Sequence, residues 1–100
     1  MKKKKTLQEI LQIFSAHKDE LRNKYGVKEI GIFGSVVRGE QKKGSDVDVL
    51  VEFDKTPDVF LLIDLEDHLK DLTGTKVDLV RKAAIRAELK DQIAKEAMYI

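Results

Sequence analysis

Residues 34–51 read GSVVRGEQKKGSDVDVLV, and the second half of this stretch predicts the central strand of the fold. Successive side chains of a strand point to opposite faces of its sheet. The valines of DVDVLVEF, residues 46–53, therefore share one face, and its acidic residues share the other. A carboxylate among apolar neighbours is costly unless something compensates it. We expect helices to cover the face of Val47, Val49, Val51 and Phe53, and an open face to carry Asp46, Asp48, Leu50 and Glu52.

The composition predicts one soluble domain over residues 1–100, since this length suits a single core. The 19 Lys and Arg and 18 Asp and Glu give a net charge of +1, so direct nucleic-acid binding is not expected. Cysteine is absent, which excludes disulfides and thiolate metal sites and favours an intracellular location. The stretch after MKKKK is too charged for a signal peptide, and no apolar run is long enough to span a membrane. We expect a cytoplasmic protein without membrane contact.

Hydrophobic spacing and turn residues predict the element order αβ(α)βαβα. A helix over residues 7–25 follows a capping box at Thr6 and Glu9 and ends at Gly26. VKEIGIF (27–33) and DVDVLVEF (46–53) predict strands, with a helical turn in SVVRGE (35–40) between them. A helix over 57–74, with Pro57 at its first position, leads to a short strand, KVDLV (76–80), and a helix over 84–100. The apolar end, residues 98–100, is expected to pack in the core or to join a partner interface.

The lengths of the connections predict how the three strands pair. The eleven residues 35–45 between the first two strands favour antiparallel pairing over a parallel crossover. The helix between the second and third strands suits a right-handed parallel crossover. The expected fold is of the α/β (α+β) class, a small mixed three-stranded sheet with helices packed on one face.

A third carboxylate is expected beside the aspartate pair. In KVDLV, Val77 and Leu79 point inward, so Asp78 joins Asp46 and Asp48 on the open face if the two strands are neighbours. Carboxylates this close repel each other unless cations lie between them. Oxygen-only ligands suit Mg²⁺ or Mn²⁺, and two such ions form a clamp for displacement at phosphorus.

The Gly-Ser pair before the helical turn predicts a phosphate site. Gly34 lets the backbone approach a ligand closely, and a turn that begins at Ser35 directs free N–H groups outward. Arg38, one turn later, adds a guanidinium that can hold phosphate at two points. Polyphosphate at one end of a cleft and metal at the other is the layout of nucleotidyl transfer.

The motif GSVVRGEQKKGSDVDVLVEF resembles the G-S-x10-D-x-D signature of the DNA polymerase β-like nucleotidyltransferase superfamily. With KVDLV one helix later, the whole chain is similar to the minimal, single-domain members called MNT proteins. Gly39, Ser45 and Asp78 stand in matching places, whereas Val37 stands where the family often has Ala. The resemblance implies the nucleotidyltransferase fold, two Mg²⁺ ions on Asp46, Asp48 and Asp78, and nucleotide binding by Gly34, Ser35, Arg38 and Ser45.

The resemblance also implies a biological role. MNT proteins are commonly encoded beside a HEPN-domain ribonuclease and act as its antitoxin, as in MntA-type pairs. Members of this group are understood to transfer AMP from ATP to a tyrosine of the toxin. The partners implied here are ATP and a HEPN-domain toxin, in a homo- or hetero-oligomer that the sequence does not specify.

Alternative interpretations remain for the residues and for the function. The aspartates also suit a solvated strand start or an exposed strand, Arg38 could pair with Glu40, and Ser45 could cap a turn. His17 and His68 lack a partner histidine at ligand spacing, and we do not expect either to be catalytic. The chain could instead neutralise a toxin by contact alone. Nucleotidyl transfer to a small molecule such as an aminoglycoside is a further alternative, although 100 residues leave no room for a substrate domain.

Overall fold

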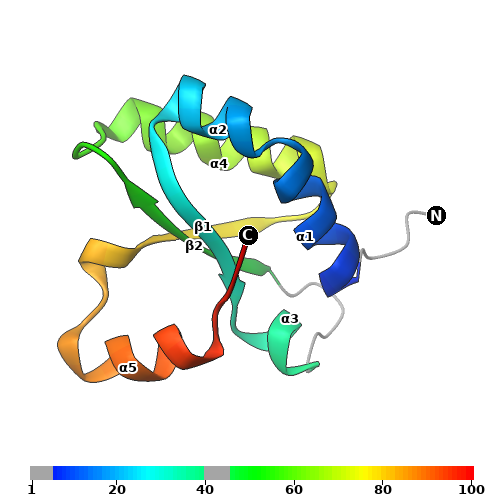
Figure 1. Cartoon of the computed structure of the whole chain (residues 1–100), viewed down its shortest axis with the longest axis vertical. Coiled ribbons are helices and arrows are strands. Elements are labelled where there is room, and N and C mark those ends of the chain that lie inside the picture. Colours follow the sequence, from blue (N-terminus) through cyan, green and yellow to red (C-terminus); the bar gives the residue numbers. More distant parts are fainter. Residues whose placement is uncertain (1–5, 40–45) are drawn as a thin grey trace.

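A mixed sheet with strand order β3-β2-β1-β4 lies at the centre of the fold (Figure 1). The structure is a computed structural model that describes residues 6–39 and 46–100. The strands are β1 (Val27–Phe33), β2 (Val47–Phe53), β3 (Val77–Arg81) and β4 (Met98–Tyr99). The predicted antiparallel pairing of β1 with β2 and the parallel pairing of β2 with β3 are both confirmed. The described sheet has four strands and not three, because the chain end returns and pairs antiparallel with the free edge of β1.

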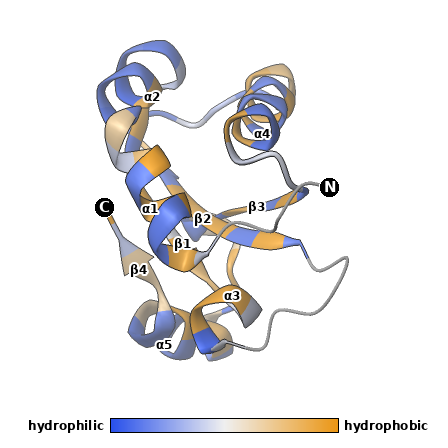
Figure 2. Ribbon diagram, turned by 90° about the vertical axis from the view of Figure 1, so that its right-hand side faces the viewer, coloured by the Kyte–Doolittle hydropathy of each residue, from blue (hydrophilic) through white to orange (hydrophobic). Residues whose placement is uncertain are grey.

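Three helices cover one face of the sheet: α1 (Leu7–Ala16), α2 (Lys18–Tyr25) and α4 (Val59–Thr73). Figure 2 shows them together on one side of the strands. The strands turn their valines to these helices, as predicted, and Val47, Val49 and Val51 are buried. The helices contribute Ile10, Phe14, Leu21, Leu65 and Leu69 to the same core. Burial of these side chains is the main favourable term that holds the helices on the sheet.

The N-terminal helix is interrupted at His17, where one continuous helix was predicted. Its capping box at Thr6 and Glu9 is confirmed. His17 has φ −107° and ψ 11°, outside the helical range, and its ring Nδ1 lies 2.8 Å from the carbonyl oxygen of Ile13. The chain resumes as α2, whose Leu21 and Tyr25 still reach the core. The break therefore changes the direction of the helix and keeps its apolar contacts.

The remaining elements differ from the prediction in their bounds and, after β3, in their kind. The helical turn is present as α3 (Ser35–Arg38). Pro57 precedes the N-cap of α4 rather than starting the helix, because the Asp58 side chain accepts a hydrogen bond from Leu61 N. The helix predicted over residues 84–100 is shorter in the structure: it follows a 3₁₀ helix η1 (Lys82–Ala84), covers Ala87–Glu96 as α5, and is replaced at its end by β4.

The second face of the sheet is partly covered as well. Leu50 points away from the valine face, as predicted, yet only 2 % of its surface is exposed. Residues of η1, α5 and β4 line a pocket above it, so α5 lies on the face opposite α1, α2 and α4. Within residues 6–39 and 46–100, no helix has both the length and the apolar content needed to cross a membrane.

Candidate active site

The β2–β3 pairing places two of the predicted carboxylates side by side. Asp48 and Asp78 are direct partners in the parallel ladder, and adjacent strands lie about 4.8 Å apart. Asp46 is exposed just before β2, and its charge acts on Asp48. The predicted position of Asp78 beside Asp48 on the neighbouring strand is thus confirmed, while the role of the three aspartates as metal ligands stays a prediction.

Gly34 brings backbone directly against the Asp48 carboxylate. Its φ of 78° and ψ of −149° lie in a region that side chains rarely allow. A Cβ atom at this position would lie 2.9 Å from Asp48 Cγ and would overlap its Oδ2 atom. The Ser35 N–H, next along the chain, donates a hydrogen bond to the Asp48 carboxylate. Glycine is therefore required here both by its conformation and by the space that Asp48 takes.

The surroundings of Asp48 disfavour its charged form. Burial raises the pKa of the Asp48 carboxyl, and the charges of Asp78 and Asp46 raise it further. The positive charge of Arg38 and the hydrogen bond from Ser35 act in the opposite direction and are too weak to cancel the rise. A bound cation would relieve the repulsion between the Asp48 carboxylate and its acidic neighbours, so this surrounding favours a cation beside Asp48.

Arg38 and Gly34 share a partner that the sequence did not indicate. Arg38 NH1 lies 2.6 Å from Glu96 Oε1, and Gly34 N donates to Glu96 Oε2 at 3.0 Å. Burial raises the pKa of Glu96, but the bonds from Arg38 and Gly34 outweigh burial and lower it overall. A carboxylate from α5 thus occupies two donors that were predicted to hold phosphate. No sequence signal reveals this contact, because about sixty residues separate Glu96 from both partners.

The donor set suits a hard divalent cation that is shared with a substrate. All three aspartates offer oxygen ligands, as Mg²⁺ requires. Within the described part of the chain, no group of three or more acidic, histidine or cysteine side chains is placed so that it could hold a metal ion by itself. Mg²⁺ commonly binds through one or two carboxylates together with substrate phosphates, not in an all-protein cage. The open arrangement of Asp46, Asp48 and Asp78 fits this mode of binding.

Other predicted residues fall outside this cluster. Ser45, predicted to bind nucleotide, and Glu40, the alternative partner of Arg38, lie outside the described residues. The two histidines lie in the helical layer: His17 contacts Ile13, and His68 Nε2 lies 2.5 Å from Glu20 Oε1. Both histidines thus have contacts within the helical layer, away from the aspartates.

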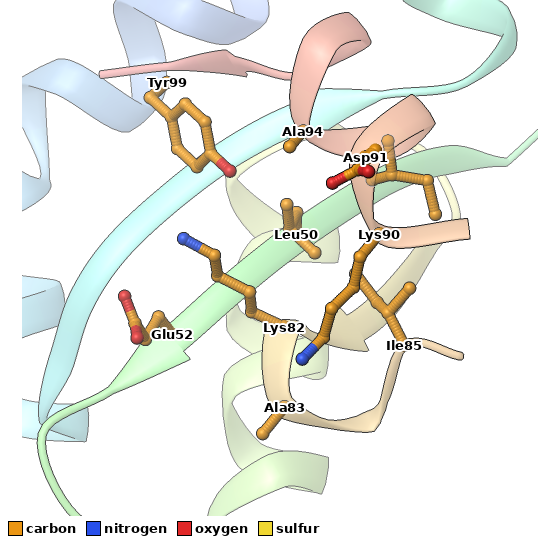
Figure 3. Close-up of a pocket in the computed structure, with 10 residues that line it drawn as sticks. Leu50, Glu52, Lys82, Ala83, Ile85, Lys90, Asp91, Ala94 and Tyr99 are labelled. Carbon is orange, nitrogen blue, oxygen red and sulfur yellow. The ribbon is translucent and has the colours of Figure 1, made fainter. Parts of the chain in front are cut away.

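A pocket of about 450 Å³ continues the open face along β2, away from Gly34. Leu50 forms its floor, two residues beyond Asp48, and Glu52 lies further along the same strand. Figure 3 shows Tyr99 on one side of Leu50, with Ala94 and Asp91 of α5 beside it. The sequence predicted that Leu50 shares this face with the aspartates. It did not predict the pocket, which requires the return of the chain through α5 and β4.

Comparison with known proteins agrees with this geometry. The profile of the nucleotidyltransferase domain family matches residues 14–100. Protein adenylyltransferase MntA of Thermococcus cleftensis is 47% identical over 95 residues, which cover 95% of this chain and 96% of MntA. A solved structure assigned as a minimal nucleotidyltransferase is 31% identical, with a TM-score of 0.72 over 88% of this chain and 93% of its own.

A crystal structure of a toxin–antitoxin complex with MntA is also similar, at 25% identity and a TM-score of 0.68. The match covers 89% of this chain and 68% of that one. The family profile, the identity to MntA and the shared fold thus agree with one another and with the Gly-Ser and Asp-x-Asp residues at the site. The chain therefore belongs to the nucleotidyltransferase domain family, within the group of minimal members that includes MntA.

Proposed function

We propose that this nucleotidyltransferase transfers AMP from ATP to a tyrosine hydroxyl of a HEPN-domain toxin, and so acts as its antitoxin. One observation carries the chemistry: Asp48 stands beside Asp78, with the backbone of Gly34 against its carboxylate. The carboxylates that would bind a metal and the backbone that would bind phosphate are therefore next to each other on neighbouring strands. The 47% identity to a protein adenylyltransferase supports a protein as the acceptor.

The phosphate end of the site is supported by the contacts of Glu96. Gly34 N–H and the Arg38 guanidinium bind an anionic carboxylate in this structure. Arginine and backbone N–H groups donate hydrogen bonds to phosphate oxygens in the same way. In the proposed complex the triphosphate takes these donors in place of Glu96, while the Ser35 N–H keeps its hydrogen bond to Asp48. The β- and γ-phosphates would then lie on the β1 side of Asp48.

The transfer itself needs few protein groups. Asp46, Asp48 and Asp78 would hold Mg²⁺, which when bound neutralises charge on the phosphate oxygens and the carboxylates. The acceptor oxygen bonds to the α-phosphorus while the bond from that phosphorus to the pyrophosphate oxygen breaks, with the two oxygens in line. The acceptor proton passes to the Asp78 carboxylate, which is exposed and therefore within reach of an incoming hydroxyl. Pyrophosphate leaves on the Gly34 side.

An exposed site suits an acceptor that belongs to a folded partner. Asp46 and Asp78 are both exposed in the part of the chain that the structure describes. The surface of a partner protein would complete the site and hold its hydroxyl in line with the phosphorus. The hydroxyl would then be positioned by the protein that carries it.

The test is transfer of labelled AMP from ATP to the HEPN-domain partner in the presence of Mg²⁺. We expect label on the partner with the wild type and none with Asp48→Asn. Asp54→Asn is the matched control, because Asp54 is an exposed aspartate at the far end of β2. Full transfer by Asp48→Asn, or equal loss in both variants, would contradict the assigned role of Asp48.

A further inference from the structure

The pocket above Leu50 has no role in the transfer described so far, although it opens on the same face of the sheet. Three groups of the site define a line across the strands: Gly34 after β1, Asp48 on β2 and Asp78 on β3. Under the proposed function this line is the axis of displacement, with pyrophosphate at the Gly34 end and the acceptor at the Asp78 end. The nucleoside is bonded to the same phosphorus and must leave this axis sideways.

The pocket lies in one of the directions left for the nucleoside. Leu50 follows Asp48 by two residues on the same face of β2, which places it about 6–7 Å along the strand. The direction runs away from Gly34, because β1 and β2 are antiparallel and Gly34 lies at the start of β2. A group attached to the α-phosphate through a ribose therefore reaches the pocket without crossing the displacement axis.

The walls of the pocket suit a flat aromatic ring. Leu50, Ile85, Ile93 and Ala94 supply apolar surface, and the Tyr99 ring forms one side. Gly31 makes this position of Tyr99 possible: a Cβ there would lie 3.0 Å from Tyr99 Cδ1, so the ring rests on bare backbone. Aromatic side chains are the common stacking partners of nucleobases.

Polar groups stand only around the edge of this space. Lys82 Nζ lies 5.8 Å from the centre of the Tyr99 ring and 3.7 Å from Glu29 Oε2. Lys90 and Asp91 approach from α5 (Figure 3). Apolar walls with polar groups at the rim resemble the usual small-molecule pocket, in which a few polar atoms orient an apolar group. The side chain of the acceptor fits this pocket less well, because the acceptor must approach from the Asp78 end of the displacement axis and the pocket lies to one side of that axis.

We infer that this pocket binds the nucleobase of the nucleotide substrate, with Tyr99 and α5 as opposite walls. The inference rests on the proposed function for the position of the triphosphate. It assigns a substrate role to the C-terminal segment, residues 85–99, which contributes no side chain to the main core that spans the sheet and α1, α2 and α4.

The test fills the pocket and compares two ligands by titration calorimetry, MgATP and magnesium tripolyphosphate, which lacks a nucleoside. Ala94→Trp adds a large ring from α5, and Gln92→Trp adds the same ring on that helix outside the pocket lining. We expect Ala94→Trp to weaken MgATP binding by about tenfold or more, as loss of base stacking does. Tripolyphosphate binding should not change, and Gln92→Trp should leave both ligands unaffected. Tyr99→Ala, from the opposite wall, should weaken MgATP binding selectively as well.

The outcomes separate this inference from the proposed function. Wild-type affinity for MgATP in both Ala94→Trp and Tyr99→Ala would overturn the inference, whatever the transfer assay shows. If that unchanged affinity came with reduced transfer to the partner, the pocket would belong to the acceptor and not to the base. Failure of the wild type to bind either ligand would instead refute the phosphate site itself.

Discussion

Substitution of Gly34 tests whether backbone and carboxylate meet as the structure has them. Alanine at φ 78° and ψ −149° carries a backbone strain of about 1–3 kcal/mol. Its Cβ would also overlap the Asp48 carboxylate, and an overpacked contact costs about 1–3 kcal/mol more. We therefore expect Gly34→Ala to lower the free energy of unfolding by about 2–6 kcal/mol. Each kcal/mol corresponds to roughly 4–8 °C in Tm for a domain of this size.

Gly26→Ala is the matched control. Gly26 also has a positive φ, 71°, but a Cβ there meets nothing within 4 Å. Its substitution carries only the cost of a left-handed residue, about 1–2 kcal/mol. Chemical denaturation of both variants, with and without Asp48→Ala, separates conformational strain from the overlap. With Asp48 shortened to alanine, the overlap with the carboxylate is removed and only a contact of 3.2 Å with the Cβ of residue 48 remains, so the cost of Gly34→Ala should fall towards its conformational strain.

Two results would refute this reasoning. One is a cost for Gly34→Ala no larger than that for Gly26→Ala. The other is a cost that stays the same after Asp48→Ala, because the carboxylate would then not be the group that Gly34 leaves room for. Loss of nucleotide transfer in Gly34→Ala at a temperature where the variant is folded would connect the same contact to function.

Three further predictions follow from the charges of the site. In the absence of metal, Asp48→Asn should leave Tm unchanged or raise it, because it removes a carboxylate whose pKa is raised by burial and by the charge of Asp78. A fall in Tm would contradict the repulsion between these two carboxylates. Glu96 has a lowered pKa, so its stabilising effect should be present above the unfolded pKa of about 4.3 and be lost as the pH falls below it. Urea unfolding should then show the difference between wild type and Glu96→Gln shrinking below about pH 4. ATP should raise Tm when Mg²⁺ is present, because an ATP concentration of roughly 100 times its Kd adds about 2.7 kcal/mol to the free energy of unfolding. An equal rise in Tm after the metal is chelated would argue against a metal held by the carboxylates.

The strands and their faces could be predicted because alternation is a local property. Val47, Val49 and Val51 point to the helices, and the parallel register then sets Asp48 against Asp78. The glycines on either side of α3 are also a local signal, because Gly34 and Gly39 both have a positive φ, which other residues rarely adopt. This is why the positions of the strand carboxylates and of the glycines around α3 could be predicted without a structure.

The parts that escaped prediction depend on distant contacts. No glycine or proline marks the break at His17, and the apolar repeat passes through it unchanged. The sequence KEAMYI favours a helix locally, yet Met98 and Tyr99 pair with β1 because that edge of the sheet is otherwise open. The Glu96 contacts and the pocket over Leu50 are consequences of this pairing, so they could not be predicted without it.

The central claim is that the clustered aspartates catalyse AMP transfer to a partner protein. The most direct measurement is the intact mass of the HEPN-domain partner after co-expression with this chain. We predict an increase equal to one or more AMP units with the wild type. With the Asp46→Asn/Asp48→Asn double variant, which should still fold, we predict an unchanged mass and no protection of the cells. Full protection by the double variant, with the mass of the partner unchanged in both cases, would contradict the claim and favour an antitoxin that acts by contact alone.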